Sequence, residues 1–439
     1  MFKTLVGAFK NKDIRKKILY TLLILVVDRV GSLLPTPGVD TNYFSSLLSG
    51  IITGDLSYLS AFTGGSFERM SLFALSITPY ITSSIIMQLL TIAIPKLEEM
   101  QKEGEDGRKK IASITRYVTI GLSLIESIAM AVGFGRSGLI KDSAQLSTLH
   151  YVVCIIVVIA ALTAGSAVLM WLGERITEKG VGNGISIVLL INIISGMPSD
   201  FATLYSTFVA PKTPAKGVLA AVIILAILIV MVVLVCFLQD GERRIPVQYS
   251  QKVSGRRTVG GQSTNIPLKV NTAGVMPIIF ASSLMQFPVI IAQLFGKSYE
   301  WTRYLSSSYW CRVEAPKYSI GLLVYIVLLI IFAYFYTSIT FNPIEVADNL
   351  KKAGGVIPGI TPGKSTSEYL NKILNYIVFI GAVGLLIIAL IPIMCTGFFN
   401  ASVSFGGTSI IIIVGVVLET LKQIESQMCN RYYKGFLSE

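Results

Sequence analysis

Few residues in this chain are suited to covalent chemistry. The 439 residues include one histidine, His150, so a Ser/His/Asp set or a histidine metal cluster would depend on a single imidazole. Neither H-E-x-x-H nor G-x-S-x-G occurs, and no two cysteines have the C-x-x-C spacing of zinc sites. A disulfide between Cys311 and Cys395 is the one pairing left open. We therefore expect no enzyme activity, no metal site and no cofactor.

One stretch is close to a phosphate-binding loop without matching it. Residues 359–365 read Gly-Ile-Thr-Pro-Gly-Lys-Ser, but the pattern G-x-x-x-x-G-K-[ST] needs glycine at position 358, which is Pro358. No strand is predicted before it. We therefore reject a nucleotide site here.

Ionisable residues inside apolar segments are the remaining chemical candidates. They are Asp28, Arg29, Glu126 and Glu419. A charged side chain within a membrane span is a functional candidate by default. A proton-coupled carrier, however, needs several carboxylates that converge near mid-membrane, and Glu126 alone lies mid-span. Single polar contacts between helices are the simpler interpretation, and a secondary transporter of a small solute is the alternative hypothesis.

The composition is that of a polytopic membrane protein. Hydrophobic residues make up 53% of the chain and charged residues 14%, and the mean hydropathy is +0.68. Apolar runs of about 18 residues or more are long enough to cross a bilayer. We predict an all-α fold with ten transmembrane helices, at about 18–35, 72–94, 114–135, 151–173, 183–198, 217–239, 271–295, 319–341, 370–393 and 405–427.

The basic residues predict how the chain is oriented. With both termini in the cytosol, the cytosolic segments hold 27 Lys and Arg residues and the outer loops hold 8. Such an excess in short loops is the positive-inside pattern. The net charge of +12 therefore indicates membrane topology in the first place.

The segment from 60 to 92 is unlike a simple lipid-facing helix. It contains Gly64-Gly65, Pro79 and a Thr-Ser-Ser cluster at 82–84 within or beside an apolar run. Irregular backbone at membrane depth persists only when it is buried in protein or lines a wet cavity. We therefore expect its first half to fold into an internal passage. Ile77 and Ile81 share one helix face, and packing on a neighbouring helix is the alternative role for that face.

Two longer segments, 240–270 and 342–369, are rich in basic residues. Solvated positive-inside signals are one interpretation. Docking of a large acidic partner, either RNA or protein, is the other.

Long ordered motifs give the chain a family resemblance. They include Pro35-Thr-Pro-Gly-Val-Asp40, Trp171-Leu-Gly-Glu-Arg-Ile-Thr-Glu-Lys-Gly-Val-Gly-Asn-Gly-Ile-Ser186, Gln262-Ser-Thr-Asn-Ile-Pro-Leu-Lys-Val-Asn271, Ala273-Gly-Val-Met-Pro277, Ala347-Asp-Asn-Leu-Lys-Lys352 and Phe405-Gly-Gly-Thr-Ser409. Over nearly its whole length the chain resembles the SecY/Sec61-alpha family of protein-conducting channels.

This resemblance implies a gated channel in the bacterial cytoplasmic membrane. Unfolded preproteins would cross it, and hydrophobic segments would leave sideways into the lipid bilayer. Two pseudo-symmetric halves, 1–200 and 201–439, would surround an hourglass pore. The implied partners are SecE, SecG, the SecA ATPase, the ribosome, and signal peptides with their preproteins.

The resemblance also assigns site residues. A pore ring would consist of Ile77, Ile81, Ile185, Leu189, Ile279 and Ile412. A plug half-helix at about 57–70 would include Phe62, Gly64, Gly65, Phe67 and Arg69. The second and seventh spans would form a lateral gate with polar contacts at Gln88 and Asn271.

Partner docking would use basic residues of the two long cytosolic segments. They are Arg243, Arg244, Lys252, Arg256, Arg257, Lys351, Lys352 and Lys364. One position departs from the family, which usually carries arginine where this chain has Thr361. Charge-dependent docking at that position is therefore left open, with Lys364 nearby as the alternative source of positive charge.

Overall fold

The described part of the protein is helical, with a three-stranded sheet and a separate pair of strands at one end. The computed structural model describes residues 7–41, 44, 63–135, 147–210, 214–249, 252–254, 257–259, 263–294, 300–306, 309–311, 316–399 and 407–434. Within these residues a helix lies at each of the ten predicted positions. They are α2 Lys12–Leu33, α5 Thr78–Ala93, α7 Glu105–Gly135, α8 Thr148–Lys179, α9 Gly184–Leu204, α10 Pro214–Asp240, α11 Met276–Leu294, α13 Ile320–Thr340, α15 Lys364–Phe399 and α16 Gly407–Lys434.

Shorter helices connect some of these long ones. They are α6 Pro95–Lys102, α12 Glu300–Leu305, α14 Pro343–Lys352, the π-helix η1 Tyr205–Val209 and the 3-10 helix η3 Pro316–Ser319.

Six of the described helices are long and apolar enough to cross a membrane: α7, α8, α9, α10, α13 and α15. The bent pair α5 and α6 is a seventh candidate. Over their described residues, α2, α11 and α16 do not meet the same criterion, and α2 carries the charges of Asp28 and Arg29 inside it. The prediction of a helical multi-pass membrane protein is confirmed, although fewer than ten helices qualify on apolar length alone.

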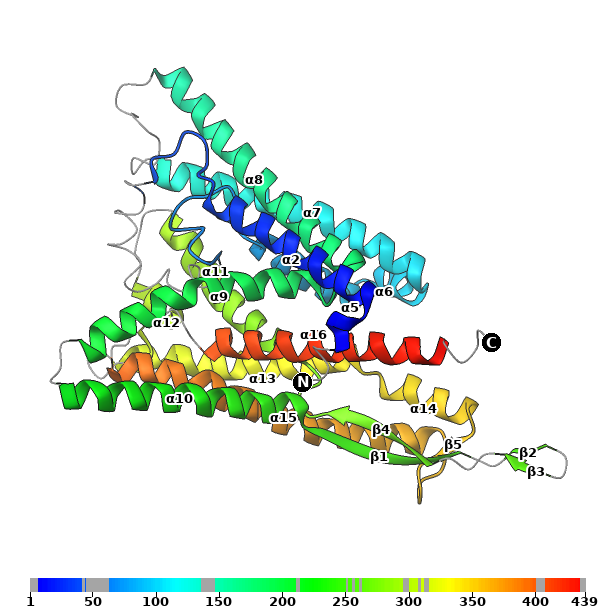
Figure 1. Cartoon of the computed structure of the whole chain (residues 1–439). Helices are drawn as coiled ribbons and strands as arrows, with labels where there is room; N and C mark the ends of the chain where they lie inside the picture. The colour runs from blue at the N-terminus through cyan, green and yellow to red at the C-terminus, as the bar shows by residue number, and fades with distance from the viewer. Residues whose placement is uncertain are drawn as a thin grey trace.

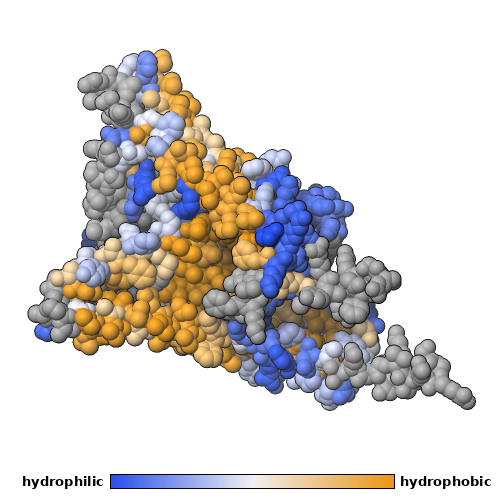
Figure 2. Space-filling model, in the orientation of Figure 1, coloured by the Kyte–Doolittle hydropathy of each residue, from blue (hydrophilic) through white to orange (hydrophobic). Residues whose placement is uncertain are grey.

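By their contacts the long helices form two groups, and in Figure 1 α7 and α8 of the first group lie above α10, α13 and α15 of the second. In the first group α7 packs on α5 and α8, and α8 packs on α2 and α9. In the second group α13 packs on α11 and α15, and α16 packs on α10 and α15. Contacts of α9 with α16 and of α7 with α11 join the groups. Figure 2 shows a broad apolar surface over the helices, with hydrophilic residues gathered toward the end that bears α6 and the strands.

The described part of the segment 240–270 forms strands, although we predicted an all-α fold. β1 (Glu242–Tyr249) pairs antiparallel with β4 (Ser263–Lys269), with Ile245 opposite Ile266. β2 (Lys252–Ser254) and β3 (Arg257–Val259) form a separate antiparallel pair between them. We call this end of the molecule, seen at the right in Figure 1, the strand end.

The second long segment joins the same sheet. β5 (Gly355–Val356) pairs with the end of β1, so that the strand order is β4-β1-β5. Ile245 and Val247 alternate with exposed residues along β1 and pack against α15 residues such as Leu370. Because side chains alternate between the two faces of a strand, this spacing places both on the buried face. The two predicted docking segments are therefore one packed unit.

Residues 64–70 lie in turns rather than in the half-helix that we predicted for about 57–70. Gly64 and Gly65 both have positive φ, +60° and +79°, which interrupts a right-handed helix. The stretch then runs beside the end of α2, where the Leu72 amide donates to the Leu34 carbonyl at 2.8 Å. The part of the predicted half-helix from 57 to 62 lies outside the described residues.

The predicted second span is shorter than expected at its beginning and bends at its end. α5 begins at Thr78 instead of residue 72, and α6 leaves it at an angle of 106°. Ile94 between them is extended, with φ −112° and ψ 111°, as a residue before proline prefers. Pro95 then occupies the first turn of α6, where a missing amide hydrogen has no cost.

Four cysteines are free thiols: Cys154, Cys236, Cys311 and Cys395. Both Cys311 and Cys395 are unpaired, so the disulfide that the sequence left open is not formed.

Candidate functional site

The first two predicted ring residues are held where an irregular segment becomes α5. Ile77 directly precedes the helix, and the Ile81 amide donates to the Ile77 carbonyl at 3.1 Å. The Thr78 hydroxyl donates to the Leu75 carbonyl at 2.8 Å and satisfies a carbonyl of the preceding turn. The chain therefore presents Ile77 and Ile81 one helical turn apart.

A tight corner between α8 and α9 positions the next two. The Asn183 side chain accepts a hydrogen bond from the Ile185 amide at 3.2 Å and caps α9. The Gly184 amide donates to the Thr177 hydroxyl at 2.9 Å. A Cβ on Gly184 would lie 1.9 Å from the Gly173 carbonyl oxygen, so only glycine allows this approach. The corner fixes where α9 starts, and with it the positions of Ile185 and Leu189.

The second helix group supplies the last two residues. Ile279 lies in the first turn of α11 and Ile412 in the second turn of α16, and both are buried.

All six predicted ring residues meet in one apolar cluster. Ile77, Leu189, Ile279 and Ile412 are buried members, and Ile81 and Ile185 are partly buried and pack against them. The cluster thus contains side chains from both helix groups. Its six branched side chains offer no polar atom, so they can bind neither an ion nor a hydrogen-bonding solute directionally.

The predicted plug residues are placed in different surroundings. Phe67 is buried beside Met70 and meets Phe44 edge to face at a ring-centroid distance of 6.1 Å. Gly64 and Gly65 are partly buried, and the Arg69 side chain is exposed. Phe62 lies outside the described residues. The described part of this stretch therefore packs through Phe67 on the first helix group.

The two predicted gate residues are not hydrogen-bonded to each other. The Asn271 amide group donates to the carbonyl of Gly274, three residues on, at 2.9 Å. Gln88 lies in α5, and its buried side-chain oxygen has no partner. α11, which follows Asn271, packs on α7 of the first group.

The predicted docking residues gather at the strand end. Arg243 and Arg244 are exposed on β1, where Arg244 pairs with Glu242 at 2.6 Å. Lys351 and Lys352 are exposed at the end of α14, and Lys364 is exposed at the start of α15. Lys252 and Arg257 belong to β2 and β3, whereas Arg256 is outside the described residues.

Thr361 has a local structural role. Its hydroxyl donates to the Ser365 hydroxyl at 2.9 Å, and its carbonyl accepts from the Thr366 hydroxyl at 3.0 Å. Both contacts lie in the first turn of α15. Thr361 thus stabilises a helix start and adds no charge to the basic surface.

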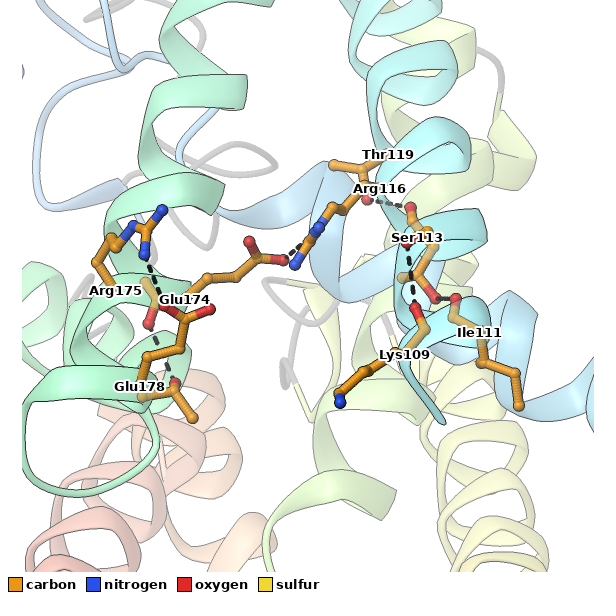
Figure 3. A network of polar contacts seen from close by, with 11 residues as sticks. Lys109, Ile111, Ser113, Arg116, Thr119, Glu174, Arg175 and Glu178 are labelled. Atoms are coloured by element: carbon orange, nitrogen blue, oxygen red, sulfur yellow. Dashed lines mark hydrogen bonds and ion pairs between the residues drawn. The ribbon is translucent and has the colours of Figure 1, made fainter. Parts of the chain in front are cut away.

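Sequence reasoning missed an ion-pair network at the strand end (Figure 3). Arg116 of α7 and Glu174 of α8 point toward one another, and Nε of the arginine lies 2.7 Å from a carboxylate oxygen. Next along α8, Arg175 pairs with Glu178 at 2.7 Å and lies over the Trp171 ring. The only signal in the sequence was the presence of opposite charges at the ends of two neighbouring spans.

The ionisable residues within the helices do not form a cage. Asp28 is fully buried and lies 3.3 Å from the guanidinium of Arg29, which also donates to the side-chain oxygen of Asn192. Among the described residues, no three His, Cys, Asp or Glu side chains gather in a metal-binding arrangement.

Comparison with known proteins gives a consistent match. Residues 71–421 match the sequence profile of the SecY family. The chain is 43% identical over 452 residues to the protein translocase subunit SecY of Streptomyces galbus, and 43% identical over 446 residues to that of Halalkalibacterium halodurans. In both comparisons all of this chain and all of the relative are covered.

Solved structures share the fold. A structure described as a protein-conducting channel aligns with a TM-score of 0.59 and 18% identity, covering 94% of this chain and 92% of the other. Sec61 in a canine ribosome-channel complex aligns with a TM-score of 0.57 and 17% identity, with the same coverage. At such identities the likeness concerns the fold.

Proposed function

Because the chain belongs to the SecY family of protein translocase subunits, we propose that it conducts unfolded preproteins through a passage closed by its six-residue aliphatic ring. The family assignment makes the chain a protein-conducting membrane channel, with no enzymatic activity of its own. The proposal names the residues that carry out this function. The observation that carries it is the meeting of all six aliphatic side chains, from both helix groups, in one cluster.

An aliphatic ring suits a substrate of variable sequence. Branched hydrocarbon side chains make no directional bonds, so the ring can widen around any extended peptide. A hydrated ion would lose water in such a constriction without gaining ligands, which is costly. The alternative, a solute transporter, needs polar groups at the constriction, and these six side chains have none.

The plug and the gate complete the proposed cycle. In the resting channel the stretch at 63–70 packs on the first helix group through Phe67. A signal segment would part α5 from α11 near Gln88 and Asn271 and let hydrophobic segments enter the lipid. Gln88 supports this role because its buried oxygen lacks a partner, so the closed gate there is incompletely satisfied. Only a modest difference in affinity for the open and closed states is needed to shift such an equilibrium.

The strand end is the proposed cytosolic docking surface. Basic residues of both long segments lie on the sheet β4-β1-β5 and on the helices α14 and α15 that pack with it, so a partner would meet a preformed surface. Its proposed partners are the SecA ATPase and the translating ribosome. A relative of similar fold occurs in a ribosome-channel complex, which supports the second. SecE and SecG are the proposed membrane partners. The two halves, 1–200 and 201–439, are proposed to move relative to one another when the channel opens. Both termini are proposed to lie in the cytosol.

The decisive experiment places a photo-crosslinker at Ile81 in the membrane-embedded translocase and stalls a secretory protein during transport. We expect crosslinks to the stalled chain. Ile125 of α7, whose side chain is 62% exposed, carries the same crosslinker as a control and should not react with it. Equal crosslinking from both positions, or none from Ile81, would reject the ring as the path.

A further inference from the structure

A buried polar cluster lies directly beside the proposed ring. Arg29 of α2 donates from Nη2 to the side-chain oxygen of Asn192 in α9. Asn192 in turn donates from Nδ2 to the hydroxyl of Ser76, at 3.0 Å. These contacts join three segments that are far apart in the sequence.

The cluster lies close in sequence to three of the ring residues. Ser76 directly precedes Ile77, which is followed by α5 with Ile81 in its first turn. Asn192 lies three residues beyond Leu189, on the same face of α9 and farther from the α8–α9 corner. The hydrogen bonds therefore tie α2 to both segments of the first helix group that carry the ring.

The proposed plug stretch contacts the same two residues, through the backbone of Asn192 and the side chain of Arg29. A Cβ on Gly64 would lie 2.6 Å from the Asn192 carbonyl oxygen and 3.2 Å from Nη1 of Arg29. Gly64 also has a φ of +60°, which favours glycine. The backbone at Gly64 therefore packs directly on Asn192 and Arg29, and a larger residue at position 64 would push the plug stretch away from them.

The surroundings make this cluster costly to break. Asn192 is buried, and the Arg29 side chain is 25% exposed next to fully buried Asp28. The adjacent carboxylate balances the arginine's charge, which allows the pair to lie at membrane depth. Breaking the hydrogen bonds of Asn192 to Arg29 and Ser76 would leave its side-chain amide unpaired among apolar residues.

We infer that Arg29, Asn192 and Ser76 form a polar clamp that positions the plug stretch against the ring in the resting channel, and that opens when a polypeptide enters. The clamp rests on the proposed function, because it acts through the ring and the plug. Its members are positioning residues, since the ring and plug, rather than the clamp, close the passage.

The test replaces Asn192 by leucine in the full translocase, reconstituted in bilayers. Leucine has nearly the same volume but removes both side-chain hydrogen bonds. The resting ion conductance should rise about tenfold, the change expected when a hydrogen bond to a charged group is lost. Transport of an ordinary preprotein should persist, and export of one with a defective signal should increase. A misfolded channel would instead lose transport.

A second variant separates the clamp from general damage. Ser76→Ala removes one acceptor only, so it should raise conductance less, and it should add nothing in combination with Asn192→Leu. Thr163→Val is the matched control, because it removes another hydrogen bond between helices of the first group, to Ser127 at 3.1 Å. Its conductance should equal that of the wild type.

The outcomes distinguish the clamp from the channel proposal. If Asn192→Leu transports preproteins and conducts ions no more than Thr163→Val, the clamp is wrong while the ring stands. If the wild-type protein fails the Ile81 crosslinking test, the ring is wrong and the clamp falls with it.

Discussion

Gly184 illustrates how single atoms set the position of the ring. Its Cα lies where any side chain would strike the Gly173 carbonyl and the Ile176 side chain. Because Asn183 caps α9 at this point, a shift here would move Ile185 and Leu189 along with the helix. The requirement for glycine therefore comes from the close approach of two helices.

We predict that Gly184→Ala destabilises the protein by about 1–3 kcal/mol or more, the usual cost of overpacking a filled site. Gly196→Ala, in the same helix, is the control, because a Cβ there meets no atom within 4 Å. Gly196→Ala should be neutral or stabilising by up to about 1 kcal/mol, since alanine favours the helix. Thermal unfolding of both purified variants in detergent checks this, and equal midpoints would contradict it.

Ile279 allows a test of the ring at a single position. Ile279→Asn would bury an amide among hydrocarbon side chains, which costs about 1–3 kcal/mol in the closed state and nothing comparable once water enters. We expect higher resting conductance and relaxed discrimination of signal sequences. Ile279→Leu keeps the volume and the apolar character, so it should behave as wild type. Wild-type conductance and discrimination in Ile279→Asn would show that this position is not part of the seal.

Residue types alone revealed only part of this site. The spacing of Ile77 and Ile81 indicates a shared face, but nothing local marks Ile279 or Ile412, which enter through the family resemblance. Asn192 and Ser76 were missed because their hydrogen bond joins residues 116 positions apart. The sequence around a single Asn in an apolar run does not indicate its hydrogen-bond partner, because that partner comes from a distant segment of the chain.

At the scale of elements, the helices were predictable and the strands were not. Long apolar runs predict helices, because a segment that crosses a bilayer must satisfy its backbone hydrogen bonds internally over about 20 residues. β5 has only two residues and pairs with β1 across more than a hundred positions, so no local pattern indicates it. The start of α5 was misplaced because apolar residues continue through the turns that precede it. Positive φ angles at Gly64, Gly65, Met70 and Ser76 distinguish these turns from a helix, and the sequence did not reveal them.

The strand end leads to a prediction about docking. Reversing the charges of Arg256 and Arg257 should weaken binding of the cytosolic partner. The loss should shrink as salt rises, because salt screens interactions between charges over about 8–10 Å at 0.1–0.15 M. Arg303→Glu, an exposed arginine in α12 between α11 and α13, is the control and should bind normally. Affinity measured at several salt concentrations checks the prediction. A loss of affinity that is independent of salt would contradict it.

The two helix groups are joined across the whole molecule by contacts of different kinds. The aliphatic ring cluster lies between them, and α16 packs on α9. Toward the chain termini, Lys17 of α2 donates to the side chain of Gln427 in α16 at 3.2 Å. Apolar side chains can slide past one another and stay in contact, because their attraction has no preferred direction. A hydrogen bond such as that between Lys17 and Gln427 holds its two atoms at a fixed distance. In the proposed channel, we expect the groups to part at the ring while α16 remains attached to α2.

The orientation of the whole molecule can be tested through Cys311, which the basic-residue pattern places outside the cell. A variant that keeps only this cysteine should react in intact cells with a membrane-impermeant maleimide. Burial raises the pKa of the Cys311 thiol, so the reactive thiolate should be scarce at about pH 7 and labelling should accelerate toward about pH 9. In the same background without Cys311, Lys351→Cys, at the strand end, should react only after the membrane is permeabilised. Labelling of Lys351→Cys in intact cells would place the strand end outside the cell and reverse the proposed topology. The strand end could then not be a cytosolic docking surface.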